Sequence, residues 1–158
     1  MIRRTTIVLM AIAACLGVAA CGSSDDSSSD DGTLSRSELA KKADAICKTG
    51  EKDAETVTAP ASFDDANDAA AYFGAIVPLH QKQTDSLAAL KPDADAKADW
   101  DAFMATQNAN QELLDTILAK AKAKDPTGQQ DLQKFTAQSQ AFAAAAKKIG
   151  SAGCAGTA

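Results

Sequence analysis

Residues 129–150, QQDLQKFTAQSQAFAAAAKKIG, carry the clearest helical pattern in the sequence. Apolar and small residues recur there at spacings of three and four, which places them on one face of an α-helix. Gly150 follows as a residue suited to the left-handed turn after a helix. The recurring positions are Leu132, Phe135, Ser139, Phe142, Ala146 and Ile149.

Three earlier segments show the same spacing. Ser35 and Glu38 form the S-x-x-E pattern of a capping box, and predict a first helix that ends at 58–60. A second helix is expected from about residue 63, with a kink because Pro78 removes a backbone hydrogen bond. A third is expected after 91–93, before the turn signal at 125–128.

These four segments decide the fold class. The chain is rich in alanine, has few Val and Ile residues, and shows no strand-like alternation. Four amphipathic helices joined by three short connections predict an all-α, antiparallel up-down-up-down four-helix bundle with a kinked second helix.

The N-terminus reads as an export signal. Arg3 and Arg4 precede an apolar run over 7–20, which is shorter than the about 20 residues of a spanning helix. The run ends in Val18-Ala19-Ala20-Cys21, which resembles the bacterial lipobox. We therefore expect residues 1–20 to be a lipoprotein signal peptide and Cys21 to carry lipid; the alternative is an ordinary signal peptide with a coincidental cysteine.

Residues 22–32 contain only Gly, Ser and Asp, and cannot bury apolar surface. Residues 21–34 are expected to be the lipidated Cys21 and a disordered tether, and residues 35–158 the helical domain. The predicted location is the extracytoplasmic face of the cell membrane, with the lipid anchor as the membrane contact and no other cofactor.

The four cysteines divide into two pairs. Cys15 leaves with the signal peptide and Cys21 receives lipid, so Cys47 and Cys154 remain in the domain. Two cysteines in an exported domain favour a disulfide. A redox-active pair or two free thiols are the alternatives, although the sequence has no C-x-x-C spacing.

Three short features resemble the small helical lipoproteins of high-GC actinobacteria. They are the segments Ala43-Asp44-Ala45-Ile46-Cys47 and Lys91-Pro92-Asp93-Ala94-Asp95, and a final cysteine after Lys148-Ile149-Gly150. The resemblance covers about residues 35–155. It implies an envelope lipoprotein with a bundle fold and carries over no catalytic residue.

Charge and motifs exclude several functions. The net charge of −5 and the pI near 4.8 argue against a nucleic-acid-binding surface. One histidine excludes a multi-histidine metal site, and no metal ligands are predicted.

No hydrolase, nucleotide-binding or zinc-protease motif is present, so we do not expect the protein to be an enzyme; a hydrolase would need an unrecognised site around His80. Most carboxylates, Asp44 included, fall on polar helix faces and predict a solvated surface.

Polar residues at inward-pointing positions are the exception. Two structural interpretations are a hydrogen-bonded layer that fixes helix register and a helix rotation that exposes some of these side chains. The functional interpretation is a small polar ligand site between the helices, with Trp100, Phe103 and Met104 as its apolar wall. The five positions are His80, Gln83, Gln107, Asn110 and Ser139.

The leading functional hypothesis is a non-enzymatic binding or interaction module of the cell envelope. Its partner would be an unknown envelope protein or a small ligand. The alternative is a small-ligand or metal-binding sensor that uses the polar residues in the middle of the bundle.

Overall fold

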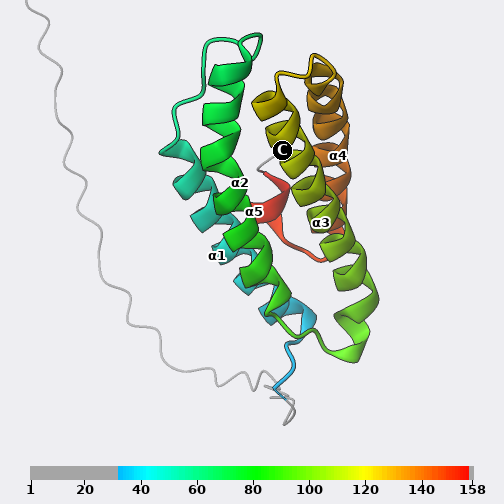
Figure 1. The fold of residues 1–158 in the computed structure, drawn as a ribbon. Coiled ribbons are helices and arrows are strands. Elements are labelled where there is room, and N and C mark those ends of the chain that lie inside the picture. Colours follow the sequence, from blue (N-terminus) through cyan, green and yellow to red (C-terminus); the bar gives the residue numbers. More distant parts are fainter. Residues whose placement is uncertain (1–31, 157–158) are drawn as a thin grey trace, which may run out of the picture.

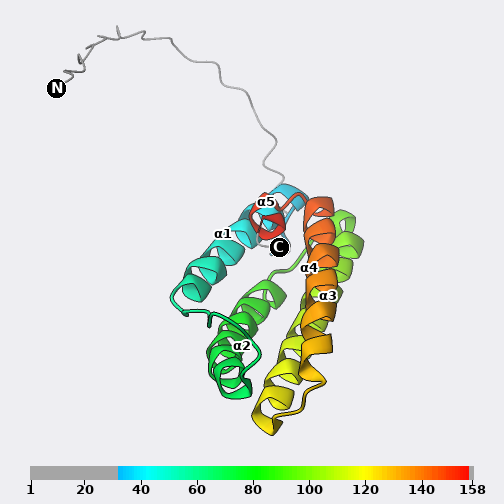
Figure 2. The same cartoon turned by 90° about the horizontal axis from the view of Figure 1, so that it is seen from above.

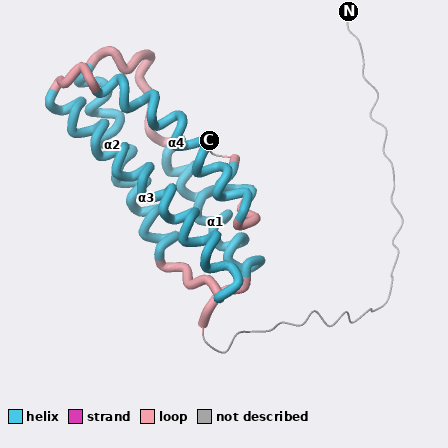
Figure 3. Tube along the Cα trace, turned by 90° about the vertical axis from the view of Figure 1, so that its right-hand side faces the viewer, coloured by secondary structure: helices cyan, strands magenta, loops and turns pink. Residues whose placement is uncertain are grey.

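The computed structural model describes residues 32–156, which form four long helices and one short one (Figure 1). Successive long helices run in opposite directions, and the loops between them lie at the two ends of the bundle (Figure 3). The predicted all-α four-helix bundle is confirmed. The predicted signal peptide, the predicted lipidation site Cys21 and residues 22–31 of the predicted tether lie outside the described residues. The helices are α1 (Arg36–Glu55), α2 (Ala66–Ala88), α3 (Ala94–Ala123), α4 (Gly128–Lys148) and α5 (Ala152–Ala155).

Side chains cap the first three helices. Ser35 begins α1 with both bonds of the capping box, because its Oγ accepts from the backbone N–H of Glu38 and its own N–H donates to the Glu38 carboxylate. Asp65 accepts from two backbone N–H groups at the start of α2, and Asp93 accepts from Ala96 at the start of α3. These bonds satisfy donors that have no partner inside the helix.

Helix α1 ends earlier than the sequence predicts. Its last residue is Glu55, whereas the prediction placed the end at 58–60. The Thr56 hydroxyl donates to the carbonyl of Asp53 at 2.6 Å. The residues that follow include β-branched Val57 and Thr58, which have low helix propensity. Local side-chain bonding therefore stops the helix before the proline.

Helix α2 continues through Pro78 as a single helix, as predicted. The short connection after α3 also matches the prediction, with Lys124 in the left-handed conformation at φ 57°. Gly150 has φ +80° after α4, in agreement with its predicted place beyond the helix end.

The long helices do not pack equally. Extensive contacts join α2 to α3 and α3 to α4, whereas α1 packs against α2 and against the short α5. Helix α5 also packs against α4, and it lies between α1 and α4 when the bundle is viewed from above (Figure 2). The sequence did not predict α5, which connects α1 to α4.

A disulfide and a carboxylate attach α5 to α1. The predicted bond between Cys47 and Cys154 is present, with 5.1 Å between the two Cα atoms. Asp44 Oδ1 accepts from the Ser151 hydroxyl at 2.5 Å and from the Gly153 N–H at 2.8 Å. A Cβ at residue 153 would approach Asp44 to 3.1 Å, so the close contact favours glycine.

The prediction that Asp44 lies on a solvated polar face is wrong. Asp44 is half-buried, and its partners are 107 and 109 residues away in the sequence. Helical periodicity places a residue on a face of its own helix and does not reveal a distant segment that covers that face.

The N-terminal edge of the domain includes Leu34. Its backbone N–H donates to Lys91, and its carbonyl accepts from Asp93. Arg36 then binds the backbone carbonyls of Asp95 and Lys148. Leu34 therefore pairs with the domain, although the predicted tether included it.

The apolar core is divided into two clusters. The larger one surrounds the disulfide and contains Trp100, Phe103 and Phe142. The smaller one lies toward the opposite end and contains Phe73, Leu114 and Ile117. None of the helices within residues 32–156 has the length and apolar surface that crossing a bilayer requires.

We predict that removing the disulfide with the double substitution Cys47→Ala and Cys154→Ala lowers the free energy of unfolding by about 4 kcal/mol. The cysteines are 107 residues apart, so the bond restricts the unfolded chain strongly. Urea unfolding followed by circular dichroism measures the change. Reductant should destabilise the wild type and leave the variant unaffected; equal stability of the two proteins would contradict the prediction.

Candidate ligand-binding site

The five predicted polar residues lie around one cavity. It has a volume of about 410 Å³ and is lined by residues of all four long helices. Along each of α2, α3 and α4, the polar residues lie between the residues that belong to one apolar cluster and those that belong to the other. The five residues therefore form a polar layer across the middle of the bundle. The predicted residues that line the cavity are His80, Gln83, Gln107, Asn110 and Ser139.

The apolar wall differs from the prediction. Trp100, Phe103 and Met104 do not line the cavity; the first two are buried in the larger cluster and Met104 packs against it. They lie one to two turns before Gln107 on α3, on the disulfide side of the polar layer. Phe135 and Phe142 of α4 form the wall instead.

Two amide side chains bind His80. Its Nδ1 lies 2.7 Å from Gln111 Oε1, and its Nε2 lies 3.4 Å from Gln107 Nε2. An amide oxygen can only accept and an amide NH₂ can only donate, so these contacts assign a neutral ring with the proton on Nδ1. Burial lowers the pKa of His80 below its ordinary value of 6.5, while the bond to Gln111 and the charge of Asp115 act in the opposite direction.

The sequence did not single out Thr84 or Gln111. Gln107 Nε2 donates to Thr84 Oγ1 at 2.9 Å, and Thr84 Oγ1 donates to the backbone carbonyl of His80. Thr84 follows His80 by four residues and Gln111 follows Gln107 by four, so each lies one turn further on the same face. A search one turn beyond each polar position would have found both residues.

Asn110 contributes an unsatisfied polar atom. The residue is 4% exposed, and its Oδ1 has no hydrogen-bond partner in the described part of the chain. A buried acceptor without a donor costs about 1–3 kcal/mol. Asn110 thus weakens the folded state in this layer, a feature that a purely structural layer does not need.

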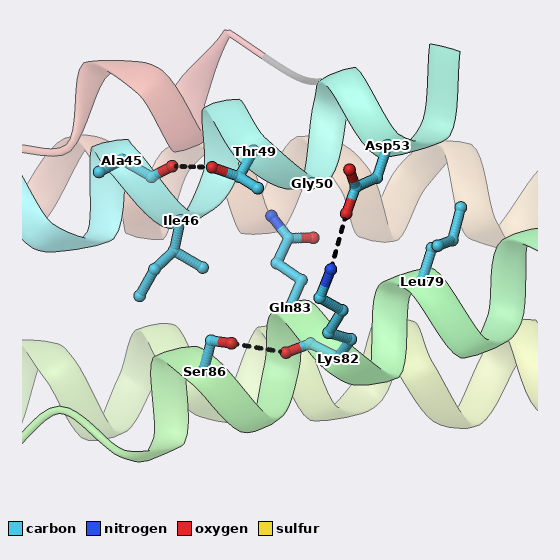
Figure 4. A pocket seen from close by; sticks show the side chains of 9 residues that line it. All are labelled: Ala45, Ile46, Thr49, Gly50, Asp53, Leu79, Lys82, Gln83 and Ser86. Carbon is cyan, nitrogen blue, oxygen red and sulfur yellow. Dashed lines mark hydrogen bonds and ion pairs between the residues drawn. The ribbon is translucent and has the colours of Figure 1, made fainter. Parts of the chain in front are cut away.

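Gln83 separates the cavity from a second, outer groove. That groove lies between α1 and α2 and has a volume of about 220 Å³. Figure 4 shows the Gln83 side chain rising from α2 toward Gly50 of α1, beside the ion pair of Lys82 with Asp53. A Cβ at residue 50 would lie 2.9 Å from the Gln83 side chain, so Gly50 makes room for it. Gln83 and Gly50 line both spaces.

The remaining wall comes from α1. Cys47 and Ala54 contribute small surfaces, and Glu51 and Glu55 contribute two exposed carboxylates. Neither Lys nor Arg lines this cavity. Among residues 32–156 no group of three or more His, Cys, Asp or Glu side chains is arranged to hold a metal ion.

Comparison with known proteins gives no relative to guide the interpretation. No family model, curated protein or solved structure matches the chain.

We predict that stability falls as the pH drops through 6.5, and that His80→Gln reduces this fall. The folded pKa of His80 lies below 6.5, so the unfolded chain takes up a proton first and acid favours unfolding. The carboxylates with lowered pKa values, such as Asp131, lose their stabilising effect only at lower pH, below about 4.

Urea unfolding between pH 7.5 and 5.0 measures this dependence. His80 is the only histidine in the chain, so no other imidazole titrates in this range. The prediction would be contradicted by a variant whose stability falls as steeply as that of the wild type.

Proposed function

We propose that the protein is a cell-envelope lipoprotein that binds a small ligand in the central cavity of its helical domain. Lipid on Cys21 would hold the domain at the extracytoplasmic face of the membrane, and residues 22–31 would connect the two. The observation that carries the binding function is the cavity itself. Five inward-facing polar side chains surround it, and one of them, Asn110, has a buried acceptor without a donor.

The size and composition of the cavity support this proposal. Ligand sites have volumes of about 300–1,000 Å³ and combine apolar walls with a few polar groups. The volume of about 410 Å³, the two phenylalanines and the amide side chains fall within this description. A layer that served only to fix helix register would leave neither an open volume nor an unpaired acceptor.

A structural role and a binding role predict different results for Asn110→Leu. Leucine has a similar volume and removes the unsatisfied acceptor, so we expect the variant to be as stable as the wild type or more stable. If the cavity binds ligands, the same variant loses binding. Asn108→Leu is the matched control, because Asn108 lies on the same helix and is exposed.

The measurement is a thermal-shift screen of neutral, cationic and anionic small molecules, run on the chain isolated from its producing cells. A ligand at 100 times its Kd stabilises the folded state by about 2.7 kcal/mol, which raises Tm by several degrees. We expect compounds that stabilise the wild type and the Asn108→Leu control, but not Asn110→Leu. A stable Asn110→Leu variant that binds as well as the wild type would assign the layer a structural role only.

The lipid anchor has a test of its own. We predict that Cys21→Ser abolishes incorporation of labelled palmitate, because only the thiol of the lipobox cysteine forms the thioether to the diacylglycerol. Cys15→Ser, in the predicted signal peptide, is the control and should leave incorporation unchanged. Labelling that persists in Cys21→Ser would place the lipid elsewhere or exclude it.

A further inference from the structure

The charged side chains that line the cavity are both acidic. Glu51 and Glu55 lie one turn apart on α1 and both line it. No ion pair within 4 Å involves either carboxylate in the described part of the chain, where the five pairs join other residues. With no Lys or Arg in the lining, the two carboxylates set the sign of the local potential. An anionic ligand would be repelled, and a cation would be attracted.

The polar interior does not oppose a cation. Burial lowers the pKa of His80 despite the opposing effects of Gln111 and Asp115, so the ring adds no positive charge at neutral pH. Asn110 offers an amide whose Oδ1 lacks a donor. Rotation of a terminal amide exchanges its oxygen and nitrogen, so this side chain can present an acceptor to an N–H group in the cavity.

The lining favours an organic cation over a metal ion. Ca²⁺ takes six to eight oxygen ligands, and Mg²⁺ requires an octahedral set. The cavity offers two carboxylates, and no cluster of three or more metal-ligating side chains occurs in residues 32–156. Phe135 and Phe142 add apolar surface, and phenyl faces attract ammonium groups.

Building on the ligand-binding function proposed above, we propose that the cavity takes a small organic ammonium ion with an apolar body. Glu51 and Glu55 supply the opposite charge, and Asn110 supplies an acceptor for an N–H donor. Phe135 and Phe142 pack against the apolar part of the ligand.

Three probes with the same phenyl group test the charge preference. They are 2-phenylethylammonium, the neutral 2-phenylethanol and the anionic phenylacetate. Isothermal titration of the full chain, as isolated from its cells, measures their binding. We expect the ammonium ion to bind at least tenfold more tightly than the alcohol, and phenylacetate to bind most weakly. Added salt should weaken only the binding of the ammonium ion, because it screens the exposed carboxylates.

The double substitution Glu51→Gln and Glu55→Gln tests which groups create the preference. Both residues are exposed, so the fold should remain intact, as circular dichroism and Tm would show. We expect the ratio between ammonium and alcohol affinities to fall below threefold, with alcohol binding unchanged. Glu112→Gln, at an exposed position on α3 that does not line the cavity, is the matched control and should preserve the ratio.

The outcomes separate this inference from the function on which it rests. Equal binding of all three probes, lost in Asn110→Leu, would overturn the charge preference and leave ligand binding in place. An ammonium preference that survives the double substitution would overturn the role of Glu51 and Glu55. Failure of all three probes to bind would also overturn the inference, and the screen described above would then decide the ligand-binding function by itself.

Discussion

Helix α1 depends on the attachment of α5. On one side α1 packs against α2, and on the other its extensive contacts are with the four residues of α5. The Cys47–Cys154 disulfide and the bonds of Asp44 to Ser151 and Gly153 fix that contact. Because α5 also packs against α4, the disulfide and these hydrogen bonds link α1 to α4 through α5. The wall that α1 gives to the cavity depends on them.

The polar layer explains why a cavity forms in the middle of the bundle. Above and below it, phenylalanine, leucine and isoleucine side chains fill the interior. Within it, the amides of Gln107 and Gln111 are positioned by hydrogen bonds to Thr84 and His80, which restricts how closely they can pack. Gly50 removes a side chain from the α1 wall at the same level. An apolar layer of equal size would close this space and gain stability, so the polar layer exchanges stability for an accessible interior.

The helices could be predicted well from the sequence because the signals that define a helix come from residues close together in the chain. The capping box of Ser35 and the spacing that ends at Ile149 depend on residues within a few turns, and the five polar positions follow from the same periodicity. The missed features depend on distant segments. Asp44 looks like a surface residue until α5 covers it, and α5 is too short to show a period. The cavity wall of Phe135 and Phe142 depends on the rotation of α4, which spacing alone does not determine.

The disulfide also turns most of the domain into a covalent ring. Residues 47–154 contain α2, α3 and α4 together with their connecting loops. A protease that cuts within the ring, for example in the exposed segment 124–127, leaves two fragments that the sulfurs still hold together. A cut before α1 separates the whole domain from the preceding residues. Proteolysis thus has two distinct outcomes: a nicked domain whose two fragments remain joined by the disulfide, or an intact domain separated from the residues before α1.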